Sequence, residues 1–339
     1  MTSRDQWVDY AKGIGIVLVV YGHTARGIAG SGMQFDRQVF TLADSILYTF
    51  HIPLFFFLSG LYFISSLEKY GTAGVIAKKA DALLYPYVLW SLLQGTIEVL
   101  LSNYTNGNAR FLDVLAFAWR PRAQFWFLYV LFLVSLASAV AYARKQQYTV
   151  PAALCTACVL FLFQELLPEK SLFRFFAQQS IFFAAGVYSR QLLVWAQNNA
   201  RTLFACSIIP AVLGQWYFHA VLHHTYTAPD YPLLLILSML SIMCIIAFCM
   251  ILSSSRIPWL GMLGASSLAI FVMHILAGSG ARIILKKIFG IENIPVHLLL
   301  GTLSGILIPL GAVRILRTYN ITLLLSPPAA IRLYDRLRR

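Results

Sequence analysis

Long apolar runs recur along this chain and constrain its fold more than any other feature. Each run is about 20 residues long, the length that an α-helix needs to cross the hydrocarbon core of a bilayer. Transmembrane β-strands are about half that length and alternate between apolar and polar residues. Charged residues make up 12% of the 339 residues and apolar residues 59%, whereas soluble domains contain about 25% charged residues. We therefore predict an all-α, polytopic membrane protein.

The hydropathy pattern predicts about ten transmembrane helices in one domain, residues 1–320, followed by a basic interfacial tail, residues 321–339. The polar residues of the first span argue against a cleaved signal peptide. Lys and Arg are more frequent on the side of the two termini, which predicts that both termini are cytoplasmic. The predicted spans are residues 6–25, 43–66, 82–102, 125–143, 150–166, 173–194, 202–222, 232–253, 258–279 and 294–316.

The formal net charge of +13 does not indicate nucleic-acid binding. The basic residues are scattered in short loops and at the C-terminus, where such residues set topology and contact anionic lipids. All five cysteines lie in apolar runs, so no disulfide framework is predicted, and the C-x-x-C of Cys155 and Cys158 has no second pair. We predict no metal site, although three histidines lie close together in the sequence: His219, His223 and His224.

Ionisable residues interrupt the first apolar run at Asp9, Lys12 and His23. A charge near the bilayer centre costs roughly 2.5–3.5 kcal/mol on insertion scales, so such residues indicate a functional site. Lys12 and His23 are eleven residues apart, which places them on nearly the same helix face, roughly 16 Å apart. A neutral imidazole is the usual general base for a hydroxyl group, and His23 is our first candidate. Arg26 is more simply explained as an interface anchor.

Two further spans carry candidate polar residues near their ends. His51 precedes Pro53, which kinks a helix, and is either a second site imidazole or a structural hydrogen-bonding residue. Lys78 and Lys79 lie before the third span. They either anchor the chain to the inner face or form a cationic entrance for an anionic cosubstrate. Glu98, deeper in that span, faces either the outer leaflet or a polar cavity.

The loop before the fourth span brings together aromatic and guanidinium side chains. These residues form either an aromatic belt with interface arginines or a platform for a sugar chain or an anionic headgroup. They are Trp119, Arg120, Arg122 and Trp126.

The ninth span contains Ser267 and His274, seven residues apart. Two helical turns put both residues on one face but about 10 Å apart, too far for a hydrogen bond. We therefore reject a Ser–His dyad and keep both as lower-ranked site residues.

Five segments occur in an order that resembles the membrane acyltransferase-3 family of bacteria, in particular its fucose 4-O-acetylase-related branch. They are WVDYAKGIGIVLVVYGH, FHIPLFFFLSG, LLYPYVLW, FWFLY and SSLAIFVMH. The resemblance covers nearly the whole chain. It implies ten core helices in the bacterial inner membrane. It also implies transfer of an acyl group, usually acetyl, from cytoplasmic acetyl-CoA to sugar hydroxyls of cell-envelope or exported glycans.

The signature of the family is Arg-x10-His in the first helix. Its His corresponds to His23, whereas its Arg position holds Lys12. Lysine keeps the charge but lacks the bidentate guanidinium fork. We expect Asp9 to pair with Lys12 and to lower the cost of burying both charges.

The resemblance implies a role for each of the candidate residues. His23, with Asp9 and Lys12, is expected to be catalytic, as a general base or as a transient acyl carrier. The expected acyl-CoA contacts are Lys78, Lys79, His51 and Tyr87. The expected acceptor contacts are Trp119, Arg120, Arg122 and Trp126. The lower-ranked residues are His274, Ser267 and Glu98.

The expected partners are acyl-CoA as cosubstrate with no bound cofactor, a glycan or lipid-linked sugar as acceptor, and membrane lipids. Composition alone equally suits a transporter or flippase for a lipid-linked sugar or a small anion. Transfer or hydrolysis of labelled acetyl-CoA distinguishes these two functions.

Overall fold

The chain is predominantly helical in the part that its computed structural model describes, residues 5–34, 36–102, 111–144 and 148–337. No strand occurs in these ranges. Seven helical stretches within them are long and apolar enough to cross a membrane. The chain is therefore a polytopic, all-α membrane protein, as predicted. The last two residues of the predicted tail lie outside the described residues.

The remaining predicted spans correspond to three other helices. α1 (Gln6–Ala29) has 24 residues and carries the polar residues singled out above. α8 (Thr149–Leu162) and α9 (Leu172–Ser189) have 14 and 18 residues. Each of the ten predicted spans thus coincides with a helical segment.

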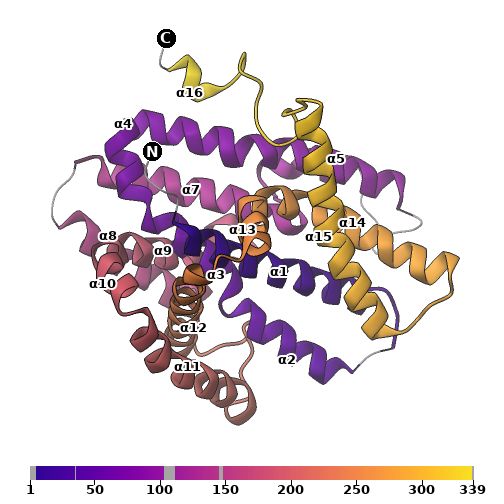
Figure 1. Ribbon diagram of the computed structural model, residues 1–339, viewed down its shortest axis with the longest axis horizontal. Helices are drawn as coiled ribbons and strands as arrows, with labels where there is room; N and C mark the ends of the chain where they lie inside the picture. Colours follow the sequence, from indigo (N-terminus) through magenta and orange to yellow (C-terminus); the bar gives the residue numbers. More distant parts are fainter. Residues whose placement is uncertain (1–4, 35, 103–110, 145–147, 338–339) are drawn as a thin grey trace. The chain divides into compact units, whose positions relative to one another are not determined.

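The helices form two compact units. The first unit contains residues 1–55 and 191–311, and α1 packs within it against α2, α12, α13 and α14 (Figure 1). Its further helices are α2 (Arg37–Tyr48), the start of α3 (His51–Leu61), α10 (Leu193–Asn198), α11 (Ala200–Trp216), α12 (Tyr231–Leu252), α13 (Pro258–Ala265), α14 (Ser267–Ile283) and most of α15 (Ile294–Thr318).

Glycines allow α1 to approach α13 closely. A methyl group at Gly13 would lie 2.6 Å from the carbonyl oxygen of Leu260, and one at Gly264 would overlap the carbonyl oxygen of Asp9. Lipid tails are as apolar as the helix surfaces, so association in a membrane depends on close packing of small residues. This contact fixes α1, and with it the polar residues that α1 carries.

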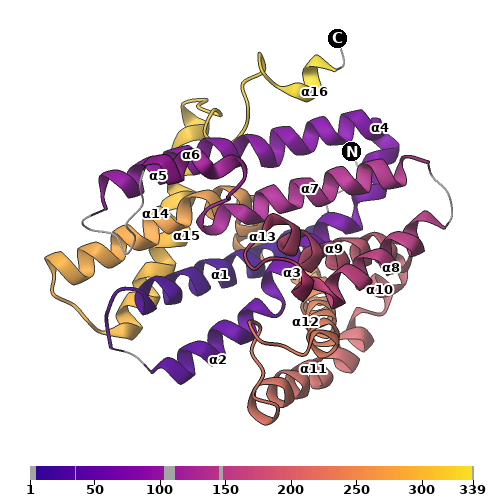
Figure 2. The ribbon, with the colours of Figure 1, turned by 180° about the vertical axis from the view of Figure 1, so that it is seen from behind.

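The second unit contains residues 56–190 and 312–339. α8 and α9 lie side by side in it (Figure 2). α3 crosses α9 through Gly60 and Gly186, where added methyl groups would overlap the carbonyl oxygens of Phe183 and Phe57. Its further helices are α4 (Phe63–Lys79), α5 (Tyr85–Leu100), α6 (Phe111–Leu115), α7 (Trp126–Ala141) and α16 (Leu333–Arg336).

Three predicted boundaries differ from the observed ones. The ninth span is broken at Ser266 into α13 and α14. The third span is part of a longer stretch, Phe63–Leu100, that changes direction at Gly71, where φ is 68°. The seventh predicted span, residues 202–222, is α-helical only to Trp216 and ends as a π-helix, Tyr217–Val221. A hydropathy average detects an apolar run but not a kink inside it.

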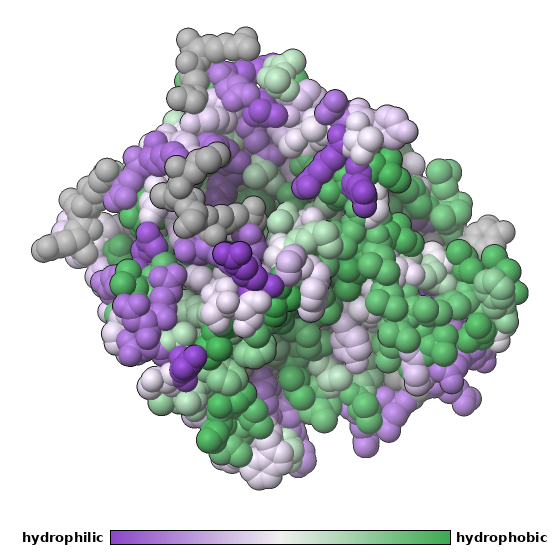
Figure 3. Space-filling view, in the orientation of Figure 1, coloured by the Kyte–Doolittle hydropathy of each residue, from purple (hydrophilic) through white to green (hydrophobic). Residues whose placement is uncertain are grey.

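Apolar side chains cover much of α15. Leu299, Leu307 and Ile308 each expose more than half of their surface. Hydrophobic side chains gather over this helix in Figure 3. An exposed apolar helix face is expected where a helix contacts lipid.

Candidate active site

Two histidines from helices far apart in the sequence meet in the first unit. His23 lies near the C-terminal end of α1 and His274 in the middle of α14. Their ring centroids are 5.1 Å apart and the rings are tilted by 55°. His274 is 2% exposed, whereas His23 is half-buried. The packing of α1 on α14 therefore creates an imidazole pair with one accessible member.

A backbone carbonyl of its own helix fixes the orientation of His274. Its Nδ1 lies 2.7 Å from the carbonyl oxygen of Phe271 and 3.2 Å from that of Ile270. A carbonyl only accepts, so Nδ1 carries the proton. Nε2 is buried and has no hydrogen-bond partner in the described part of the chain. In the neutral ring this nitrogen keeps a lone pair that can accept a proton.

His51 at the start of α3 is arranged in the same way. Its Nδ1 lies 2.5 Å from the carbonyl oxygen of Leu47, and its buried Nε2 lacks a partner among the described residues. The ring edge of His51 contacts Tyr48, with centroids 4.5 Å apart. His274 and His51 are thus buried imidazoles of the first unit with the same arrangement, Nδ1 facing a backbone carbonyl and Nε2 without a partner among the described residues.

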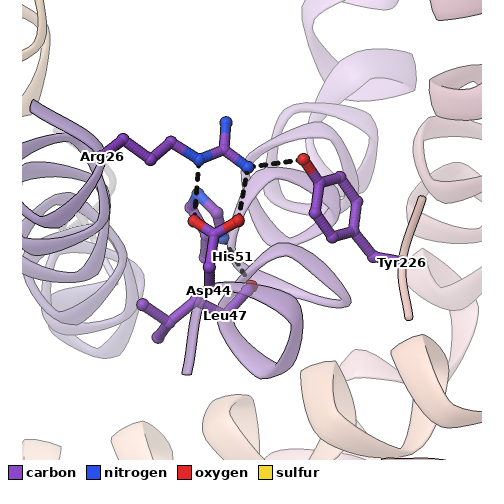
Figure 4. A network of polar contacts seen from close by, with 5 residues as sticks. All are labelled: Arg26, Asp44, Leu47, His51 and Tyr226. Atoms are coloured by element: carbon purple, nitrogen blue, oxygen red, sulfur yellow. Dashed lines mark hydrogen bonds and ion pairs between the residues drawn. The ribbon is translucent and has the colours of Figure 1, made fainter. Parts of the chain in front are cut away.

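Arg26, one turn after His23, lies in a network of polar contacts (Figure 4). Its Nε and Nη2 donate to the two carboxylate oxygens of Asp44 at 2.7 and 2.8 Å. Nη2 also donates to the Tyr226 hydroxyl at 2.5 Å, and the guanidinium carbon lies 3.5 Å from the ring centroid of Tyr48. A bidentate ion pair of this kind is strong and directional. We name Arg26, Asp44, Tyr48 and Tyr226 the Arg26 cluster.

Tyr226 comes from the loop between α11 and α12 and is held in place by α2. Its backbone N–H donates to Ser45 Oγ at 2.9 Å, and its ring stacks on Tyr48 with centroids 4.9 Å apart. Burial raises the pKa of the Tyr226 hydroxyl above its usual value. The phenol therefore stays protonated at neutral pH.

The Arg26 cluster corrects one sequence interpretation. Arg26 was expected to be an interface anchor, but it is engaged by protein groups of α2 and of a loop 200 residues away. Asp44 was detectable, because an acidic residue in an apolar run indicates a functional site. Tyr226 was not detectable, because nothing in the sequence links its loop to α1.

Asp9 and Lys12 lie toward the other end of α1, and both are half-buried. The backbone of Asp9 is at the close contact with Gly264. The expected pairing of Asp9 with Lys12 stays a prediction. Ser267 begins α14, two turns before His274, and the rejected Ser–His dyad is not formed.

The residues expected to bind acyl-CoA are divided between the units. His51 lies in the first unit, and Lys78, Lys79 and Tyr87 in the second. The Lys78 ammonium lies over the rings of Tyr70 and Tyr334, 4.0 and 4.4 Å from their centroids. The buried Tyr87 hydroxyl donates to the carbonyl oxygen of Phe117. Lys78 and Lys79 end α4.

The four residues expected to bind the acceptor belong to the second unit and make different contacts. Arg122 pairs with Glu98 at 3.2 Å, so Glu98 faces a polar partner inside the protein. Trp126 stacks on Phe175, with centroids 4.5 Å apart. Trp119 and Arg120 are exposed. A platform formed by all four side chains stays a prediction.

Comparison with known proteins identifies the family of this chain. Residues 5–314 match the acyltransferase-3 family, described as an acyltransferase domain. The chain belongs to this family and is a multi-pass membrane protein.

Two curated relatives match shorter segments. The Nodulation protein NolL of Mesorhizobium japonicum is 37% identical over 101 residues, 28% of this chain and 25% of the relative. The Nodulation protein NolL of Sinorhizobium fredii is 27% identical over 129 residues, 38% of this chain and 34% of the relative. The matched parts thus span a quarter to a third of these relatives. No solved structure matches the chain.

Proposed function

We propose that this protein is an O-acyltransferase of the bacterial inner membrane that moves an acetyl group from cytoplasmic acetyl-CoA to a sugar hydroxyl of a cell-envelope or exported glycan. The contact between His23 and His274, in a chain that belongs to an acyltransferase family, supports this proposal most directly. An acyl transfer to a hydroxyl needs a base at the reacting oxygen, and imidazole is the side chain best suited to that task near neutral pH.

His23 is the general base of the proposed reaction. It takes the proton of the acceptor hydroxyl while the hydroxyl oxygen bonds to the thioester carbonyl carbon. The tetrahedral intermediate then collapses, the carbon–sulfur bond breaks, and His23 returns the proton to the CoA thiolate. Ester and free thiol are the products, so protons and bonds balance. Were His23 itself acylated, labelled protein would accumulate without an acceptor.

His274 supports His23 in this scheme. Its Nδ1 donates to the Phe271 carbonyl, so the lone pair of its Nε2 points away from the backbone of α14. A neighbouring lone pair stabilises a protonated imidazole by accepting its N–H. In the Arg26 cluster, one turn away on α1, the Asp44 carboxylate balances the guanidinium charge, so the cluster would hold α1 and α2 in place around His23.

In the second unit, Lys78 and Lys79 carry charges that suit the phosphates of CoA. In the first unit, the Lys12–His23 face of α1 would hold the thioester at His23. His51 would contact the thioester end and Tyr87 the donor entrance. Asp9 would balance the charge of Lys12.

The proposed acceptor site uses aromatic faces and guanidinium groups around the α6–α7 loop. Trp119 and Arg120 are exposed and would contact sugar directly, while Glu98 fixes the position of Arg122.

The cellular experiment compares the envelope polysaccharide of a deletion strain with that of strains expressing the wild type or His23→Ala. We expect the polysaccharide to lose the mass of an acyl group on deletion. The wild type should restore it, and His23→Ala should not, although the variant reaches the membrane. An unchanged polysaccharide, combined with uptake of a lipid-linked sugar or anion by vesicles, would instead favour a transporter.

A further inference from the structure

A polar pocket of about 340 Å³ lies in the first unit, where the N-terminal end of α2 meets the α11–α12 loop. None of its described lining residues is a carboxylate. The polar lining includes Arg37, Thr41, Ser45, His219, His223 and His224. Arginine and imidazole N–H groups without a competing acid suit an anionic group such as phosphate.

An apolar groove of about 510 Å³ continues this pocket along α2, α11 and α12. Leu42 and His219 line both cavities, so the two are contiguous. α11 and α12 belong to stretches long and apolar enough to span the membrane, so the groove runs along membrane-spanning helices. The groove is lined mainly by Ile46, Phe50, Ala211, Val212, Trp216 and Ile245.

His219 lies at the junction of pocket and groove and lacks partners there. Its side chain is buried, 9% exposed, and neither ring nitrogen has a hydrogen-bond partner among the described residues. One turn earlier, Gln215 donates from Nε2 to Thr49 and Ser241, but its buried Oε1 is likewise unsatisfied. Unsatisfied polar atoms in an apolar environment are costly, so both residues indicate a ligand with polar atoms at this depth.

An anionic amphiphile fits these observations together. A free anion would occupy the polar pocket and leave the groove empty, whereas a purely apolar chain would leave the imidazole of His219 unsatisfied. A lipid that carries a phosphate has the required groups in the required order: a charge at the end of the helices, ester or ether oxygens below it, and then a hydrocarbon chain. We propose that this pocket and groove bind one anionic membrane lipid. Its phosphate contacts Arg37 and His223, its linkage oxygens contact His219, and its chain lies in the groove beside Trp216.

Trp216 lines the groove and provides the readout, because bromine atoms on a lipid chain quench a tryptophan in contact with it. The full-length protein is reconstituted in vesicles containing either dibrominated phosphatidylglycerol or dibrominated phosphatidylcholine. Subtracting the signal of Trp216→Phe isolates Trp216. We expect the anionic lipid to quench Trp216 at an about fivefold lower mole fraction than the zwitterionic lipid, the effect of one cation near the membrane surface.

The charge contacts are tested with Arg37→Gln combined with His223→Asn. Asparagine suits the left-handed backbone of His223, where φ is 53°. This exposed double variant should lose the preference for the anionic lipid. The matched control, Arg201→Gln, removes an exposed arginine at the other end of α11 and should retain it.

Three results would overturn the proposal. These are equal quenching by both lipids, an unchanged preference in the double variant, and loss of the preference on adding inorganic phosphate. The last result would assign the pocket to free phosphate. Quenching requires no acyl transfer, so the lipid site is tested separately from the proposed enzyme activity.

Discussion

Two buried histidines of the first unit are oriented by backbone carbonyls that precede them closely in the sequence. The Nδ1 atoms of His274 and His51 each face a carbonyl three or four residues earlier, which leaves Nε2 toward the interior. The sequence identified both histidines as polar interruptions in apolar runs. It could not reveal which ring nitrogen is available, or that His274 meets His23, because these depend on rotamers and on the packing of α1 against α14.

The His23–His274 contact predicts a catalytic loss in His274→Gln. A glutamine amide is far less basic than an imidazole and stabilises protonated His23 less well, so kcat should fall by about 10²-fold, the lower end for one acid–base group. KM for acetyl-CoA should change little. His297→Gln is the matched control, since His297 is a buried histidine of the same unit that does not belong to the His23–His274 pair. A wild-type kcat in His274→Gln would exclude a role in proton transfer.

The bidentate pair of Arg26 and Asp44 predicts energetic coupling. Arg26→Gln, Asp44→Asn and the double variant form a double-mutant cycle, read as free energies of unfolding in detergent. Because the two side chains are only 33% and 11% exposed, we expect a coupling energy on the order of 0.5–3 kcal/mol. Additive effects of the two single variants would show that the contact contributes no stability.

Helices pack in this protein through small residues that a hydropathy pattern does not distinguish from other apolar positions. The predicted spans agree with the helices because length and apolarity are local properties. The break at Ser266 was missed because it occurs inside an apolar stretch, whereas the change of direction at Gly71 lies in the polar segment between the second and third predicted spans. Gly264 packs against a residue more than 250 positions earlier, so the sequence could not predict its role either.

The contact between α1 and α13 predicts a strong effect of one methyl group. Gly264→Ala should destabilise the protein by about 1–3 kcal/mol, because the added carbon overlaps the backbone of Asp9. Gly280→Ala in α14 is the control, since nothing lies within 4 Å of its added methyl group. Removing a helix-interior glycine there should be neutral or stabilising by up to about 1 kcal/mol. Equal melting temperatures for the two variants would contradict the close packing.

Lys78, at the end of α4, is expected to contribute to the binding of acetyl-CoA. Lys78→Gln should raise KM for acetyl-CoA about fivefold, the effect of losing about 1 kcal/mol of exposed charge interaction, and should leave kcat nearly unchanged. Lys170→Asn, which removes another cation of the second unit, should leave KM unchanged. A lower kcat with constant KM in Lys78→Gln would contradict a role in donor binding.

At the scale of the whole molecule, each unit is assembled from segments distant in the sequence. The first unit joins residues 1–55 to residues 191–311, and the tail belongs to the second unit with residues 56–190. Asp81 accepts hydrogen bonds from the backbone N–H groups of Leu333 and Tyr334, which holds the tail on α4 and α5. The sequence predicted the tail as a separate basic segment, because such long-range pairings leave no local pattern. Its position on the inner leaflet stays a prediction.

The central claim is that His23 acts as the base of an acyl transfer in the membrane. The most direct measurement is the initial rate of transfer of radiolabelled acetyl from acetyl-CoA to an envelope glycan by purified protein in proteoliposomes. His23→Ala should lower this rate by about 10²–10⁴-fold, with unchanged elution on size exclusion and an unchanged melting temperature. Transfer by a folded His23→Ala variant at the wild-type rate would contradict the account.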